Sequence, residues 1–126
     1  MPFKFEKLEI WKLSIDFADD VHNITRKFPK EELFSLTSQF KRAADSISLN
    51  IAEGSIGQTN REQRRFIGYS IRSIAESVNC LYLALRRSYI TQAVFENQYG
   101  KAEVLIGKTT AFRNGIPVVN RRKYGL

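Results

Sequence analysis

The basic and aromatic residues between positions 61 and 86 have the clearest potential for binding chemistry in this chain of 126 residues. At helical spacing they share one side of a predicted helix, which carries Arg61, Arg65, Tyr69, Arg72, Asn79 and Arg86. Guanidinium groups bind phosphates, and an aromatic ring beside them can stack on a nucleobase. Two interpretations stay open. The residues form a nucleic-acid-binding ridge, together with Arg121, Arg122 and Lys123 near the C-terminus, or they form an ordinary solvated helix face.

The distribution of charge is uneven along the chain. The formal net charge is +7. Lys and Arg exceed Asp and Glu by four in residues 61–90 and by three in residues 117–126, whereas residues 6–27 carry a net charge of −1. Such asymmetry suggests an acidic partner, most often nucleic acid, although many basic proteins bind none.

A row of short or hydrogen-bonding side chains lies beside the apolar stripe of segment 36–54. It consists of Gln39, Ser46, Asn50 and Glu53. Polar groups that border a core cost free energy unless they are hydrogen-bonded, and Ser73 and Glu76 on the next helix are suitable partners. We therefore predict a structural polar network here and not an active site.

Residue types that support catalysis or metal binding are scarce. One histidine and one cysteine cannot supply a zinc site within a subunit, and the Glu-x-x-His pairs of di-iron bundles do not occur. His22 falls on an apolar helix face, where a core or interface histidine is more common than a catalytic one. The segment 54–58 lacks the lysine and the preceding strand of a phosphate-binding loop. We expect no catalytic residue, no metal and no cofactor, and therefore a protein that is not an enzyme.

Four amphipathic segments position these residues. Their hydrophobic periodicity predicts helices over 6–28, 36–54, 59–88 and 91–114. Short connectors join them, and strand signals are absent. The predicted fold is an all-α, antiparallel up-down four-helix bundle over residues 1–116, followed by a basic C-terminal tail over residues 117–126.

Residues typical of helix ends flank these segments. Ser35 is a suitable N-cap for the second helix, and Gly54 is expected to end that helix by taking a positive φ. Thr59 and Glu62 match a capping box at the start of the third helix. Thr91 can cap the fourth helix.

The first predicted helix is more apolar than a single bundle requires. Its apolar arc spans roughly 200°, which is wider than a surface helix needs. We expect Trp11, Phe17 and Phe28 to form an exposed patch that a second subunit covers. The first helix is mildly acidic and the third is basic, so the subunits can pair head to tail and close into a ring. A homo-oligomer is therefore predicted.

The composition favours the cytoplasm. The lone Cys80 cannot form an internal disulfide, which suits a reducing compartment. The first twelve residues lack the apolar core of a signal peptide, and no apolar run approaches the ~18 residues of a membrane span. We expect a cytoplasmic protein without membrane contact.

Motifs along most of the chain resemble those of a known family. They are Phe28-Pro29 with Glu31 and Glu32, Leu36-Thr37-Ser38-Gln39, RAADSISLNIAEG over residues 42–54, and Ser73-Ile74-Ala75-Glu76. They are similar to the F-P-x-E, L-T-x-Q, R-A-A-x-S-I-x-x-N-I-A-E-G and S-x-x-E motifs of a bacterial four-helix-bundle family. That family is named for proteins encoded in intervening sequences of 23S ribosomal RNA genes.

Two departures from the family pattern affect the expected structure. Ser48 and Leu49 stand where the family usually has proline and serine, so the second helix should run straighter here. Arg72 stands where the family usually has glycine. The resemblance implies a four-helix bundle that assembles as a ring, commonly a homopentamer. It also implies kinship with the accessory variability protein of diversity-generating retroelements, a basic ring that binds reverse transcriptase and nucleic acid.

Two functions remain as alternatives. The first is a non-enzymatic oligomer that binds RNA or DNA through the ridge at residues 61–86. The second is a scaffold or adaptor that binds another protein and no nucleic acid. An exposed basic surface would favour the first, and an exposed apolar patch would favour the second.

Overall fold

The computed structural model describes residues 2–57 and 59–118, and this part of the chain is helical without strands. It contains two short 3₁₀ helices and four α-helices: η1 (Lys4–Lys7), α1 (Glu9–Thr25), η2 (Lys30–Glu32), α2 (Leu36–Ser55), α3 (Asn60–Arg86) and α4 (Gln92–Asn114). The predicted all-α fold is confirmed. None of the helices in these two ranges has both the length and the apolar character that a membrane span requires.

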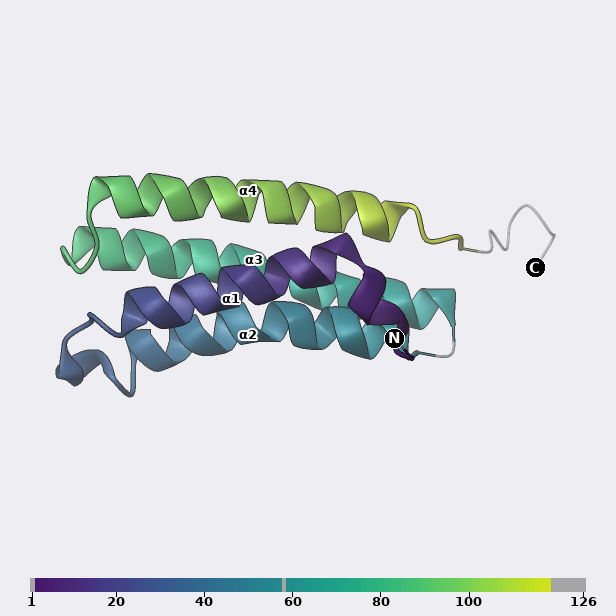
Figure 1. Ribbon diagram of the computed structural model, residues 1–126, viewed down its shortest axis with the longest axis horizontal. Coiled ribbons are helices and arrows are strands. Elements are labelled where there is room, and N and C mark those ends of the chain that lie inside the picture. Colours follow the sequence, from purple (N-terminus) through teal and green to yellow (C-terminus); the bar gives the residue numbers. More distant parts are fainter. Residues whose placement is uncertain (1, 58, 119–126) are drawn as a thin grey trace.

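The chain reverses direction at each connection between the long helices (Figure 1). Helices that follow one another in the sequence pack side by side, and α4 also packs against α1, which closes the bundle. The core is built from fully buried aliphatic and aromatic side chains of all four helices, among them Val21, Phe40, Ile47, Ile74 and Leu105. Burial of these side chains is the main source of stability.

The most extensive packing joins α2 to α3. Small side chains of α3 are buried, among them Ser70, Ser77 and Ala84. The Ser70 hydroxyl donates a hydrogen bond of 2.8 Å to the Ile47 carbonyl of α2. This bond satisfies a buried hydroxyl and fixes the two helices relative to one another.

Gly54 allows close packing and does not form a turn, so the predicted role of this residue is wrong. α2 continues through Gly54 to Ser55, and Gly54 does not have a positive φ. A Cβ atom at position 54 would lie 3.1 Å from the Phe66 Cβ and 3.3 Å from the Gln63 carbonyl oxygen of α3. These distances are tighter than ordinary van der Waals contact, so glycine lets α3 approach α2 closely without displacing it.

The N-termini of α3 and α4 follow the prediction. The Thr59 hydroxyl accepts the Glu62 N–H at 3.0 Å, and the Thr91 hydroxyl accepts the Val94 N–H at 3.2 Å. The Glu62 side chain makes no return bond to the Thr59 backbone among the described contacts, so only half of the predicted capping box is present.

Ser35 precedes α2, but the prediction that its side chain caps the helix is wrong. Its hydroxyl donates to Glu32 Oε1 at 2.6 Å, and the Leu36 N–H approaches the same oxygen at 3.4 Å. Oε2 of Glu32 accepts from the Tyr89 hydroxyl at 2.7 Å and from Arg87 Nη1 at 3.1 Å. Glu32 therefore replaces Ser35 as the cap and ties the start of α2 to the connection between α3 and α4.

These hydrogen bonds change the acidity of both partners. The bond from Ser35 contributes most to lowering the pKa of Glu32, followed by the bond from Tyr89. The bond to Glu32 in turn raises the pKa of Tyr89. The cluster thus favours an ionised Glu32 and a neutral Tyr89.

The predicted exposed patch on the first helix is wrong for two of its three residues. Phe17 and Phe28 are only 2% and 8% exposed within one subunit. Phe28 packs on Tyr89, with ring centroids 5.3 Å apart. Trp11 is half-buried and packs on Phe5 of η1 at 5.1 Å, because residues before α1 fold back over that helix. Self-association stays a prediction, but these buried phenylalanines do not provide its interface.

Candidate nucleic-acid interface

The outward side of α3 carries the predicted ridge. Its arginines Arg61, Arg65, Arg72 and Arg86 are all exposed. Tyr69 lies among them and is 39% exposed. The helical register therefore brings together the predicted residues of α3 on the surface, with Arg86 at the end of the helix farthest from Arg61.

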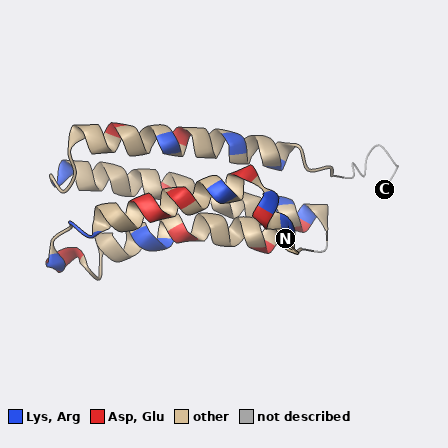
Figure 2. Ribbon diagram, in the orientation of Figure 1, with Lys and Arg blue, Asp and Glu red and all other residues tan. Residues whose placement is uncertain are grey.

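The ridge arginines are not neutralised by carboxylates. In the described ranges, the ion pairs are His22–Asp45, Glu32–Arg87, Asp20–Lys101 and Glu9–Lys108. None of them involves a ridge arginine. Figure 2 shows acidic bands on α1 and basic bands on α4, the two helices that share the last two pairs. The positive charge of the ridge is consequently available to an external anion.

An aromatic pair interrupts the ridge. The rings of Phe66 and Tyr69 meet edge to face with centroids 5.6 Å apart, and the Arg65 guanidinium carbon lies 5.4 Å from the Phe66 centroid. Phe66 was missing from the predicted site because its i+3 contact with Tyr69 was not considered. Arginine beside an accessible ring is typical of surfaces that bind single-stranded nucleic acid.

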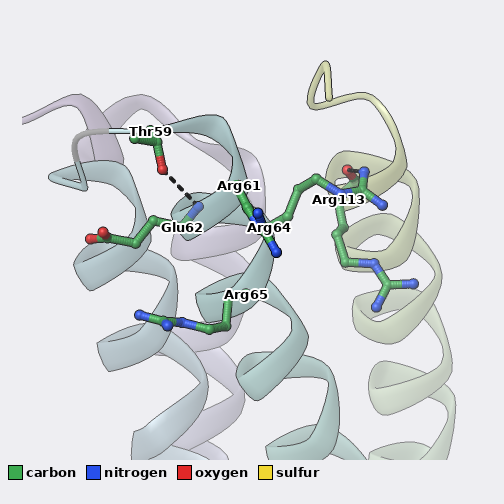
Figure 3. A pocket seen from close by; sticks show the side chains of 6 residues that line it. All are labelled: Thr59, Arg61, Glu62, Arg64, Arg65 and Arg113. Carbon is green, nitrogen blue, oxygen red and sulfur yellow. Dashed lines mark hydrogen bonds between the residues drawn. The ribbon is translucent and has the colours of Figure 1, made fainter. Parts of the chain in front are cut away.

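A basic cavity of about 570 Å³ lies at the start of α3, beside the end of α4 (Figure 3). It is lined by Thr59, Arg61, Glu62, Arg64, Arg65 and Arg113. Sequence analysis missed Arg64 and Arg113, which lie far apart in the chain and outside the predicted ridge. Nη1 of Arg64 donates to the Arg113 carbonyl at 2.6 Å and to the Ile116 carbonyl at 3.3 Å. Because both acceptors are backbone carbonyls, the sequence carries no side-chain signal for this contact.

The other predicted basic residues, Arg121, Arg122 and Lys123, lie outside the residues that the structure describes. Their part in the interface stays a prediction.

The predicted polar network between α2 and α3 is wrong. Asn50 Nδ2 donates to the Ser46 carbonyl at 2.9 Å, and the Ser46 hydroxyl donates to the Arg42 carbonyl at 2.7 Å, so these bonds stay within α2. Gln39, Glu53 and Glu76 are exposed and Ser73 is half-buried, and no hydrogen bond between the described residues joins the row to Ser73 or Glu76. Backbone carbonyls one turn earlier accept from Ser46 and Asn50, and Gln39 and Glu53 are exposed to solvent, so the row does not need partners on α3.

Gln39, Ser46 and Glu76 nevertheless line one surface cavity of about 410 Å³, together with Phe34 and Arg42. The two sides of the predicted network therefore face the same hollow without bonding across it.

The surroundings of His22 and Cys80 fit structural roles and not catalytic ones. Nε2 of His22 lies 3.0 and 3.1 Å from the two carboxylate oxygens of Asp45, which links α1 to α2. Cys80 is 1% exposed, and burial raises the pKa of its thiol to about 11. A buried thiol with that pKa is a poor nucleophile. Across the described ranges, no group of three or more His, Cys, Asp and Glu side chains is arranged to hold a metal ion.

Comparisons with known proteins place this fold in a family. No curated protein matches the chain significantly. A solved structure from Bacteroides thetaiotaomicron, described as a protein of unknown function from the S23 ribosomal protein family, has 20% sequence identity and a TM-score of 0.77. The similarity covers 82% of this chain and 97% of that chain, and it supports the fold. A family model described as 23S rRNA-intervening sequence protein matches residues 6–111. The chain therefore belongs to the 23S rRNA-intervening sequence protein family.

Proposed function

We propose that this protein is a non-enzymatic nucleic-acid-binding protein whose outer α3 surface contacts the phosphate backbone of RNA or DNA. The observation that carries the proposal is a row of exposed arginines on α3 without carboxylate partners among the described residues. An unpaired surface arginine has donors available for phosphate oxygens, whereas a paired one must first give up its carboxylate.

Phosphate contacts discriminate little between sequences, and the aromatic pair beside them favours a single strand. Phosphate contacts release counterions and carry no base information. The Phe66–Tyr69 pair beside Arg65 provides a surface on which an unpaired base can stack. The ridge is thus suited to a single-stranded segment that lies along α3.

A triple charge reversal tests the proposal. Replacement of Arg61, Arg65 and Arg72 by Glu should lower the affinity for a single-stranded RNA oligonucleotide by roughly two orders of magnitude at low salt. Fluorescence anisotropy measures the affinity, and circular dichroism confirms that the helices remain folded.

The matched control reverses the same number of charges elsewhere. Arg26, Lys27 and Lys30 are exposed in the connection between α1 and α2. This connection lies at the opposite end of the bundle from the start of α3 (Figure 1). Replacement of these three residues by Glu changes the net charge by the same amount as the α3 variant. Because these residues lie outside the ridge, binding should weaken much less if the ridge is the interface. Unchanged binding by the α3 variant, or equal losses in both variants, would reject the assignment to α3.

A scaffold function is the second candidate, and exposed apolar residues favour it. Phe34 is 91% exposed and Leu33 is 50% exposed in the connection before α2. Solvent-exposed rings of this kind are often covered by a protein partner. Pull-downs from nuclease-treated and untreated lysates separate the two functions, because only a nucleic-acid-mediated association is lost after nuclease treatment.

We also propose self-association, with the homopentameric ring as the expected assembly. Apolar side chains on two further helices support an interface, since Leu49 of α2 is 66% exposed and Val104 of α4 is 52% exposed. A hydrophobic interface should survive about 1 M salt, which screens surface charge. Light scattering after size exclusion should give about five times the chain mass of 14.5 kDa, and a mass near 14.5 kDa would refute the oligomer.

A further inference from the structure

The arginine cavity at the start of α3 differs from the open ridge because its side chains come from two helices. Figure 3 shows Arg64 directed toward Arg113 of α4, whereas Arg65 and Glu62 project to the other side of α3. The cavity therefore has a cationic wall between α3 and α4 that includes Arg64 and Arg113, with exposed Arg61 at its edge.

Arg64 is held in place before any ligand arrives. Its Nη1 donates to the Arg113 and Ile116 carbonyls at the C-terminal end of α4. A guanidinium has five N–H donors, so Nε and Nη2 of Arg64 remain for a ligand. An arginine fixed in this way loses little conformational freedom when it binds an anion.

Arg113 has an unmet hydrogen-bonding requirement. Its Nε is buried and has no hydrogen-bond partner among the described residues. A Cβ atom at Gly68 would lie 3.9 Å from Arg113 Nη1, so the guanidinium lies over α3 at the one position where that helix has no side chain. A buried donor without an acceptor costs free energy. The other N–H groups of this guanidinium also have no acceptor among the described residues, and Arg113 lines the cavity.

The charge of the cavity selects the class of ligand. Four arginines and one glutamate line it, and none of the five forms an ion pair among the described residues. The N-terminus of the 27-residue helix α3 adds partial positive charge at the same place. Several guanidinium groups and a helix N-terminus that line one cavity suit a phosphate group with several free oxygens.

From this geometry we infer that the cavity binds a terminal phosphomonoester of a nucleic acid strand, an inference that rests on the proposed function. A terminal phosphate has three free oxygens and a charge of about −1.5 to −2 at neutral pH, whereas an internal phosphodiester carries a single charge. Tyr69 follows Arg61 by eight residues, so it lies roughly 12 Å along α3 from the Arg61 end of the cavity. That separation lets a strand end in the cavity while one of its first bases reaches Tyr69.

The test compares oligonucleotides that differ only at their ends. A single-stranded RNA of ten nucleotides is prepared with a 5′-phosphate, with a 3′-phosphate or with neither, each carrying an internal fluorophore. The wild-type protein should bind one phosphorylated form about ten-fold more tightly than the form without a terminal phosphate. The two phosphorylated forms show which end the cavity accepts.

Arg61→Gln tests the cavity, and Arg86→Gln is its matched control on the same helix. The first variant should lose the preference for a terminal phosphate, so that the affinity ratio approaches one. The second removes the same charge outside the cavity and should weaken all three RNAs together while keeping the ratio. Thermal melting confirms that both variants fold.

The outcomes separate the inference from the proposed function. Equal wild-type affinity for all three RNAs would overturn the terminal-phosphate site while leaving the ridge intact, and so would a ratio that survives in Arg61→Gln. If no RNA binds at low salt, the proposed function is wrong. Pyrophosphate then tests separately whether the cavity binds an anion. A pyrophosphate-dependent rise in melting temperature that Arg61→Gln abolishes would support an anion site, and no rise would reject it.

Discussion

Two charged regions of this bundle use their side chains in opposite ways. At the seam between α1 and α4, Lys101 Nζ lies 2.8 Å from Asp20 Oδ2 and Lys108 Nζ lies 3.0 Å from Glu9 Oε1. On the outer face of α3, the ridge arginines have no such partner among the described residues. The charged side chains of the seam are paired within the subunit, whereas the ridge arginines can still pair with an external ligand.

The difference does not arise from a need for stability. Surface ion pairs contribute about 0–1 kcal/mol each, so the seam adds little to a bundle whose core is fully buried. The ridge adds nothing, since like charges along one helix repel. The uncompensated charge of the ridge therefore has no stabilising role within the subunit, which is why we propose that it binds an anion, whereas the paired seam needs no ligand to account for its charges.

Added salt should weaken nucleic-acid binding at the ridge strongly and change the stability that the seam provides only slightly. If Arg61, Arg65, Arg72 and Arg86 each neutralise one phosphate of a single strand, affinity should fall roughly 50-fold between 50 and 200 mM salt. The melting temperature should change little over the same range, because the seam contributes little. Fluorescence anisotropy and thermal melts in the same buffers measure both quantities.

An affinity that is indifferent to salt would show that phosphate contacts do not drive binding. A large loss of thermal stability over this range would show instead that surface ion pairs hold the bundle together, and the contrast between the seam and the ridge would disappear.

Close packing, and not charge, should hold α2 and α3 together. Gly54→Ala places a methyl group 3.1 Å from the Phe66 Cβ, so α3 must shift. The cost of overpacking, about 1–3 kcal/mol, exceeds the gain in helix propensity of about 1 kcal/mol, and stability should fall by up to about 2 kcal/mol. Gly107→Ala is the matched control.

Gly107 also lies inside a helix, but nothing lies within 4 Å of the position that its Cβ would take. There the helix propensity acts alone, and the substitution should stabilise the protein by about 0.5–1 kcal/mol. Urea unfolding monitored by circular dichroism measures both variants. Equal effects of the two substitutions would mean that α3 does not approach α2 as closely as described.

The threonine caps of α3 and α4 were predictable from the sequence, whereas the contacts that α2 makes at its two ends were not. Thr59 and Thr91 cap their helices as expected because a cap depends on residues only three positions apart. Ser35 does not cap α2 because the Glu32 carboxylate accepts its hydroxyl. Besides the Leu36 N–H, that carboxylate accepts bonds from Arg87 and Tyr89, which lie 55 and 57 positions later.

The candidate site likewise contains residues that the sequence could place and residues that it could not. Helical periodicity alone places Arg61, Arg65 and Tyr69 on one exposed face. The cavity depends on Arg64 and Arg113, which are 49 residues apart and meet only because α3 and α4 run antiparallel. The periodicity of the first helix overstated its exposed apolar surface, because Phe17 and Phe28 are buried in the core and Phe5, which precedes α1, packs on Trp11.

The third prediction concerns Glu32, whose carboxylate is the most fully paired charge in the described structure. Its pKa is lowered in the folded state, chiefly by the hydrogen bond from Ser35. The stabilisation is therefore complete above the unfolded pKa of roughly 4.3 and is lost as the pH falls through the lower folded value. Glu32→Gln should melt at a lower temperature than wild type at pH 7, and the difference should shrink in acid.

Glu31→Gln is the control, because Glu31 is exposed and adjacent. It should leave the melting temperature and its pH dependence nearly unchanged. Melting curves between neutral and acidic pH test the pair of variants. A difference between Glu32→Gln and wild type that stays constant on acidification would mean that the Ser35 and Tyr89 hydroxyls do not depend on the ionised carboxylate.

The smallest effect is expected at the seam itself. Asp20 and Lys101 join α1 to α4 with side chains that are 31% and 54% exposed. A double-mutant cycle of Asp20→Asn, Lys101→Met and the double variant should therefore give a coupling energy of about 0.2–1 kcal/mol at low salt. At about 1 M salt the coupling should approach zero, because screening at that ionic strength acts within about 3 Å. A coupling well above about 1 kcal/mol that persists in salt would show that the ion pairs of the seam stabilise the bundle. The lack of such pairs on the ridge would then no longer indicate that the ridge charges bind a ligand.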